Sequence, residues 1–144
     1  MRISAKGEYA IKAMVDLALH DRKELQPIQD IAARQSIPQR YLEQVLLQLK
    51  RAGFLYARRG SAGGYRLSRP ADQVTVGAVL RAVEGPPTGP DTLRRGRGGD
   101  TTGLAELWQE IAAAVASVVD RTTLEDLRRR AEERRSSARP MYHI

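Results

Sequence analysis

The segment from Pro38 to Arg51 constrains the fold of this 144-residue chain more than any other stretch. Its apolar residues recur every three or four positions, which predicts a helix with one buried face. The opposite face carries amide and charged groups, which can either be solvated or bind base edges and phosphates. The flanking segments must decide between these two interpretations. The predicted buried residues are Tyr41, Leu42, Val45, Leu46 and Leu49, and the polar face comprises Gln39, Arg40, Glu43, Gln44, Gln48, Lys50 and Arg51.

A short helix and a tight turn precede this segment. The pattern of residues 28–34 predicts a helix, with Pro27 at its first position, and residues 35–37 form the turn. Pro38 suits the first position of the next helix because it has no backbone N–H to donate. This order is typical of a helix-turn-helix, whose second helix enters the major groove of DNA.

A basic, glycine-rich hairpin follows the longer helix. Residues 54–57 and 65–67 are the predicted strands, and Arg58 and Arg59 lie in the turn between them. A hairpin placed directly after a helix-turn-helix predicts a wing that can bring guanidinium groups to a minor groove. Because no Gly-Lys-Ser/Thr follows the glycines, a Walker-type nucleotide loop is excluded.

The first predicted helix begins after Ser4, its expected cap, and runs through Leu19. Gly7 is unusual inside a helix, where it costs about 1 kcal/mol relative to alanine. It indicates either a frayed first turn or a close approach of the backbone to a phosphate beside Lys6.

The predicted DNA-binding domain covers residues 1–84 and ends with a helix over residues 76–83, capped by Thr75. Residues 85–103 are rich in glycine and proline and nearly free of apolar side chains. Such a segment cannot bury enough surface to offset its chain entropy, so we expect a flexible linker.

The longest helix is predicted from Leu104 to Asp120, within a dimerisation region over residues 104–135, and residues 136–144 form a tail. Its apolar stripe requires a partner, which the first domain or a second copy could supply, and symmetry favours the second copy. Thr122 and Glu125 predict a capping box for the last helix. The expected contacts between copies are Leu104, Leu107, Trp108, Ile111, Val115 and Val118. The predicted fold is therefore mainly α with a small β-hairpin wing: a winged helix-turn-helix plus a long C-terminal dimerisation helix.

The charge is uneven: residues 1–85 hold 14 Lys/Arg against 8 Asp/Glu, whereas residues 86–144 hold 10 against 9. A basic domain indicates a polyanionic partner such as nucleic acid or a membrane surface. The absence of cysteine excludes disulfides and cysteine-ligated metal clusters. No apolar run approaches the roughly 20 residues that span a bilayer, and no signal peptide is apparent. We expect a soluble cytoplasmic protein with no metal, cofactor or membrane partner.

Two other classes of function are less consistent with the sequence than DNA binding. An enzyme is disfavoured because there is no cysteine, neither His20 nor His143 has a plausible partner in the sequence, and nothing supplies a base for Ser61. A protein-interaction adaptor with a winged-helix fold remains the alternative. The basic first domain argues against it.

Five motifs, in order along the chain, resemble the Rrf-type winged-helix transcriptional regulators: residues 1–10, 41–44, 59–60 with 63–65, 107–108 and 123–127. The resemblance covers about residues 1–130. It implies a homodimer on a palindromic operator, with double-stranded DNA as the partner. It also implies base reading by Arg40, Glu43 and Gln44, and contacts to the DNA backbone or minor groove from Ser4, Lys6, Gln39, Arg58, Arg59 and Gly60.

The chain departs from the iron–sulfur members of this family, which carry three cysteines in the segment corresponding to residues 89–103 and a histidine at the position of Ala105. All four ligands are missing, so the resemblance is closer to the cluster-free CymR-like branch. That branch implies a repressor of cysteine or sulfur metabolism, controlled by complex formation with a cysteine-biosynthetic enzyme.

Overall fold

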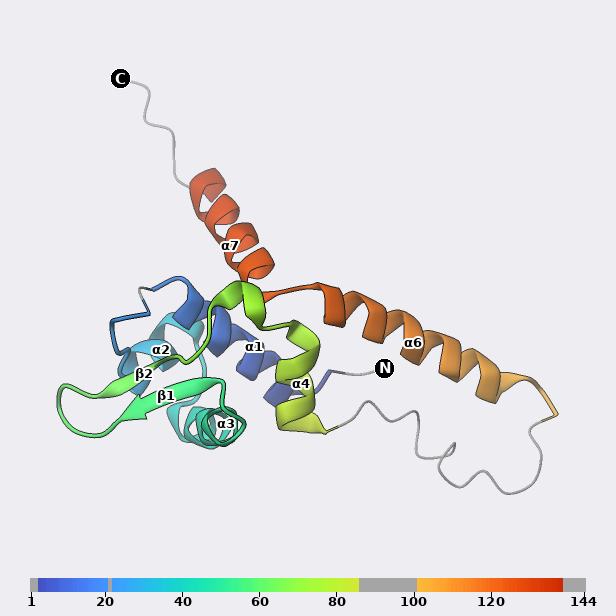
Figure 1. Ribbon diagram of the computed structural model, residues 1–144, viewed down its shortest axis with the longest axis horizontal. Coiled ribbons are helices and arrows are strands. Elements are labelled where there is room, and N and C mark those ends of the chain that lie inside the picture. The colour runs from blue at the N-terminus through green and yellow to red at the C-terminus, as the bar shows by residue number, and fades with distance from the viewer. Residues whose placement is uncertain (1–2, 21, 86–100, 139–144) are drawn as a thin grey trace.

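The computed structural model describes residues 3–20, 22–85 and 101–138. Helices dominate it, and one antiparallel hairpin follows the third helix (Figure 1). The predicted fold class is therefore confirmed. The elements are α1 (Ala5–Ala18), α2 (Ile28–Gln35), α3 (Gln39–Arg51), β1 (Leu55–Arg58), β2 (Gly64–Leu67), the 3-10 helix η1 (Ala71–Gln73), α4 (Val76–Glu84), α6 (Leu104–Arg121) and α7 (Leu124–Ala138).

One hydrophobic core joins α1 to α4, the hairpin and the first turn of α7. Met14, Leu46 and Leu124 come from three different helices, and all three are fully buried there. Burying a side chain of this size contributes about 1.5–3 kcal/mol. The core therefore fixes α3 and the hairpin against the same scaffold.

The caps predicted for α1 and α4 are confirmed. The Ser4 hydroxyl accepts a hydrogen bond from the Gly7 N–H at 3.2 Å, and the Thr75 hydroxyl accepts one from the Ala78 N–H at 3.1 Å. Each bond satisfies a backbone donor that the first helical turn leaves free.

The structure overturns the frayed-turn interpretation of Gly7. Gly7 is buried within α1, so the first turn is not frayed, and α4 lies directly against it. A Cβ at this position would come within 2.8 Å of the Glu84 carboxyl carbon and 3.0 Å of a Leu80 methyl group. A larger residue here would have to displace the Glu84 carboxylate, which accepts a hydrogen bond from Ser4.

The helix-turn-helix runs from α2 through Ser36 to α3. Ser36 adopts a left-handed conformation with φ 55°, which ends α2 and turns the chain toward α3. Pro27 and Pro38 both lie at N-cap positions rather than at the first helical positions that we predicted. This shift by one residue has little structural consequence, because a proline at either position removes no hydrogen bond from the helix.

The hairpin lies one residue away from its predicted boundaries. β1 extends to Arg58 and β2 begins at Gly64, and these two residues are directly paired. The turn between them places Gly60 at φ 109°, a conformation that favours glycine. Gly63 faces the Arg58 carbonyl oxygen so closely that a Cβ would lie 2.1 Å from it. These two glycines therefore permit the tight return of the chain.

The junction between α6 and α7 is tied to the rest of the fold by backbone hydrogen bonds. The Val76 N–H donates to the Thr122 carbonyl at 2.8 Å, and the Leu124 N–H donates to the Val74 carbonyl at 2.9 Å. From this junction α6 extends away from the body in one direction and α7 in another (Figure 1). In the described ranges, no helix is long and apolar enough to cross a membrane.

The cap of α7 differs from the prediction. The Thr123 hydroxyl accepts from the Asp126 N–H at 3.1 Å, and the Asp126 carboxylate accepts from the Thr123 N–H at 2.9 Å. The reciprocal capping box is therefore Thr123 with Asp126, and the predicted pair of Thr122 with Glu125 is wrong. The helix also continues to Ala138, three residues into the predicted tail, and residues 139–144 lie outside the described ranges.

Candidate nucleic-acid interface

The polar face of α3 is presented to solvent. Arg40, Glu43 and Gln44 are all exposed, on the side opposite the buried Leu42, Val45, Leu46 and Leu49. Within the described part of the chain, neither Arg40 nor Glu43 forms an ion pair. Their donors and acceptors are therefore available to an external partner. Gln39 is exposed at the start of the same helix, beside Arg40.

Tyr41 was predicted on the buried face, and this is wrong: 38% of it is exposed. Its ring meets that of Tyr9 from α1 edge to face, with centroids 5.4 Å apart and planes at 79°. The apolar period assigns Tyr41 to the core. The position lies in the first turn of α3, however, where the aromatic ring of α1 covers only one side of it.

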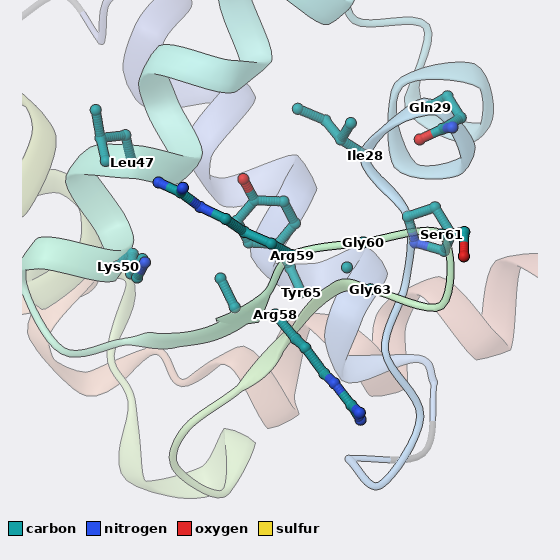
Figure 2. A pocket seen from close by; sticks show the side chains of 13 residues that line it. Ile28, Gln29, Leu47, Lys50, Arg58, Arg59, Gly60, Ser61, Gly63 and Tyr65 are labelled. Atoms are coloured by element: carbon teal, nitrogen blue, oxygen red, sulfur yellow. The ribbon is translucent and has the colours of Figure 1, made fainter.

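The wing brings a second set of cations beside α3. Arg58, Arg59 and Gly60 are exposed at the end of β1 and in the turn. Figure 2 shows Arg59 reaching toward α3, while Arg58 points away from that helix. Between the wing, α3 and the start of α2 lies a cavity of about 410 Å³, and Lys50, Arg59 and Ser61 are among its lining residues. The C-terminal half of α3, through Leu47 and Lys50, and the wing thus border one basic hollow, which Arg40, Glu43 and Gln44 do not line.

The start of α1 is already engaged within the fold. The Ser4 N–H donates to the Glu84 carboxylate at 3.0 Å, and the Ser4 hydroxyl donates to the same oxygen. A carboxylate at a helix N-terminus complements the helix dipole. Lys6 is half-buried in the first turn of α1. The geometry therefore places an anion at Ser4, but that anion is a side chain of α4.

A buried ion pair that the sequence reading missed braces α2 against α1. The Asp16 side chain is 0% exposed, and its carboxylate accepts from the Arg34 Nη2 at 2.8 Å and Nε at 3.0 Å. The Gln35 amide donates to it at 3.0 Å, and Arg34 also donates to the Gln26 side chain. The hydrogen bonds to Asp16 raise the pKa of Arg34 above its ordinary value. The signal in the sequence was one acidic residue within the apolar stripe of α1.

The predicted dimerisation residues lie along α6. Leu104, Leu107 and Val118 are exposed, while Trp108, Ile111 and Val115 are half-buried. No residue of α6 is fully buried. The C-terminal end of α6 contacts α4, where Arg81 and Asp120 form an ion pair at 2.6 Å. An apolar strip of the helix therefore remains uncovered in a single chain.

Comparison with known proteins identifies the family. The sequence profile of the Rrf2 family, described as "Iron-dependent Transcriptional regulator", matches residues 3–130. The chain belongs to the Rrf2 family. As an Rrf2 protein it is a DNA-binding transcriptional regulator with a winged helix, as the motifs predicted.

The similar proteins include both IscR and CymR regulators of the Rrf2 family. The regulator IscR of Vibrio atlanticus is 37% identical over 131 residues, covering 88% of this chain and 75% of the relative. The structure of CymR, "the Global Cysteine Regulator" of B. subtilis, superposes with a TM-score of 0.76 at 34% identity, covering 89% of this chain and 96% of CymR. T. potens IscR superposes with a TM-score of 0.78 at 30% identity, covering 100% of this chain and 94% of IscR. These similarities do not separate the two branches, so the CymR-like assignment stays a prediction.

The donor groups of this chain do not match the iron dependence in the Rrf2 description. None of the 144 residues is a cysteine, and the described ranges contain no group of three His, Cys, Asp or Glu side chains that could hold a metal ion. The thiolates that iron–sulfur clusters require are absent from the sequence. The residues present do not fit a cluster.

Proposed function

We propose that this Rrf2 protein is a sequence-specific repressor that binds a palindromic operator as a homodimer and carries no iron–sulfur cluster. The observation that carries the proposal is the common surface of α3 and the wing. Exposed Arg40, Glu43 and Gln44 lie on a helix fixed by the core, next to the exposed Arg59 of the hairpin.

Each part of this surface has a different task in the proposal. Arginine and glutamine pair with purine edges in the major groove, and glutamate accepts from cytosine N4. Glu43 also repels phosphates, which penalises poorly aligned sequences. The wing, through Gly60, and the start of α1, through Lys6, fix the register on the sugar–phosphate backbone. The net charge of +7 favours association with DNA.

Selection from a random-sequence DNA library tests this function. We expect the purified protein to enrich an inverted repeat whose half-sites lie about 34 Å apart, or a multiple of that distance, as the symmetry of a dimer requires. Enrichment of a single, non-repeated site would contradict dimeric recognition. Failure to enrich any sequence would contradict base reading by α3.

We further propose that the genes it controls serve cysteine or sulfur metabolism, with a cysteine-biosynthetic enzyme as co-regulator. The support is the likeness to CymR, whose name describes a global cysteine regulator. Transcript profiling of a deletion strain tests the assignment. We expect sulfur-assimilation genes to rise, and unchanged expression of those genes in both rich and poor sulfur sources would contradict it.

A further inference from the structure

The two faces of the wing carry different cations. In the hairpin, Leu55 pairs with Leu67 and both are buried, so these positions define the inner face. Side chains alternate along a strand, which places Tyr56 and Arg58 on the other face together with Arg66, the cross-strand partner of Tyr56. We call Tyr56, Arg58 and Arg66 the outer wing face. Figure 2 shows Arg58 and Arg59 pointing in opposite directions, so only Arg59 reaches toward α3.

The fold holds Arg66 in place without neutralising it. Its guanidinium carbon lies 4.4 Å from the centroid of the Tyr56 ring, and Tyr56 itself is 45% exposed. The Arg66 Nη1 also donates to the Arg22 carbonyl at 3.4 Å. Arg22 is anchored in turn, because its Nη2 donates to the Ser68 carbonyl at 3.1 Å. Stacking of this kind orients a guanidinium while leaving N–H donors at its edge.

No carboxylate in the described ranges forms an ion pair with Arg58, Arg59 or Arg66. By contrast, Arg34, Arg81 and Arg128 are each paired with an acidic side chain. The wing therefore presents unpaired arginines on both of its faces. Arginines on both faces can bind the phosphates of two DNA strands, one on each side of the wing.

We propose that the wing contacts both phosphodiester strands that border the minor groove. Arg59 binds the strand on the side of the recognition helix, and Arg58 and Arg66 of the outer wing face bind the opposite strand. This inference rests on the proposed DNA binding and assigns Tyr56 as the positioning residue for Arg66. The minor groove is only about 6 Å wide, so a hairpin at its mouth lies close to both of its walls.

Ethylation-interference footprinting on a duplex selected by the wild-type protein tests the assignment. We expect Arg66→Ala to remove interference at the far-strand phosphates that Arg66 contacts, while those contacted by Arg58 and the phosphates flanking α3 are unaffected. The affinity should fall roughly three- to tenfold, and the slope of its salt dependence should decrease by about one unit. Arg59→Ala should remove interference on the near strand instead.

Arg69→Ala is the matched control. Arg69 is exposed and stacks on Phe54 at 5.4 Å, but it lies beyond the end of β2 and off the outer wing face. We expect this variant to retain the wild-type footprint despite the same loss of charge. Tyr56→Ala should reproduce the loss caused by Arg66→Ala without changing the charge, and Tyr56→Phe should restore it because the ring is kept.

Two results would overturn the inference, and they are distinguishable from failure of DNA binding itself. If Arg66→Ala and Arg69→Ala give the same footprint while Arg59→Ala loses contacts, the outer wing face does not touch DNA. If Tyr56→Ala retains the far-strand contacts, Tyr56 does not position Arg66. Circular dichroism melting of every variant excludes unfolding as the cause. If the wild-type protein gives no footprint, both the proposed function and this inference fail.

Discussion

Arg40, Glu43 and Gln44 occupy little more than one helical turn, so they face the same few base pairs in the proposed complex. Arg40 and Gln44 are four residues apart and lie above one another on the helix surface. Their exposed side chains can donate to or accept from base edges, whereas the residues behind them are buried in the core. In the proposed complex, these three side chains determine which DNA sequence is bound.

Replacing Gln44 separates base reading from general DNA affinity. We expect Gln44→Ala to lower the affinity for the selected operator by about 1–3 kcal/mol, while binding to random DNA changes little. Gln109→Ala is the control, because Gln109 is also an exposed helical glutamine but lies on α6. Anisotropy titrations with both duplexes measure the difference. An equal loss on operator and random DNA would show that Gln44 reads no base.

The buried ion pair should matter for stability rather than for DNA contact. Replacing Asp16 with alanine leaves Arg34 without its partner, and we expect a loss of about 2–4 kcal/mol because Arg34 keeps some access to water. Urea denaturation measures the free energy of unfolding. The Glu8→Ala variant, which breaks an exposed pair with Lys12, should lose less than about 1 kcal/mol. Similar losses in both variants would contradict the bracing role of Asp16.

Individual residues show where prediction from the sequence reached its limit. The spacing of apolar residues predicted the buried face of α3, but it also assigned Tyr41 to that face. Spacing along one helix carries no information about how far the neighbouring helix α1 covers it. It gave no reason to link Asp16 to Arg34, which is 18 residues away and on another helix. The sequence showed that Gly7 is unusual inside a helix. The reason for a small residue there is the contact with α4, which lies far along the chain.

At the scale of elements, local signals predicted the order of the helices and the hairpin, with boundaries that shift by one to three residues. The cap of α7 failed because two adjacent threonines each precede an acidic residue by three positions. The surrounding structure decides between them. The Thr122 hydroxyl donates to the Val118 carbonyl, and the Thr122 carbonyl accepts from Val76. Thr123 is then the first residue free to cap the helix.

This cap predicts an acid-sensitive helix start. Hydrogen bonds from the Thr123 N–H and hydroxyl lower the pKa of Asp126 below its ordinary value. A carboxyl whose pKa is lower in the folded state stabilises the fold at pH values above its unfolded pKa of about 3.9, and this contribution is lost as the pH falls through the folded pKa.

Carboxyl titration by nuclear magnetic resonance measures the pKa of Asp126 directly. We expect Thr123→Ala to raise that pKa toward the ordinary value, since both the hydroxyl and the local geometry are disturbed. Thr122→Ala should leave it unchanged. A change in the Asp126 pKa caused by Thr122→Ala but not by Thr123→Ala would contradict the Thr123–Asp126 capping box.

At the scale of the whole molecule, α6 is the element whose apolar surface is least covered. Leu107 is 47% exposed, and neighbouring positions on the same strip are similarly open. The sequence predicted this stripe from its spacing, and a single chain leaves it uncovered. The predicted linker over residues 85–103 falls largely outside the described ranges.

Replacing Leu107 with aspartate tests the proposed dimer. Because the side chain is already exposed in one chain, we expect the variant to stay folded and to sediment as a monomer, whereas the wild-type protein sediments as a dimer. Gln109→Asp adds the same charge on the opposite side of α6 and should leave the dimer intact. A dimer of unchanged strength in Leu107→Asp would place the interface elsewhere.

The central claim is that this fold reads DNA sequence through α3 while the wing and the net positive charge supply general affinity. Anisotropy titration of the wild-type protein, on the selected operator and on a scrambled duplex of the same length, tests it across roughly 50–200 mM salt. We predict that both affinities fall as salt rises and that the operator is preferred by at least about a thousandfold throughout. Equal affinities for the two duplexes, or binding to the operator that does not respond to salt, would contradict the account.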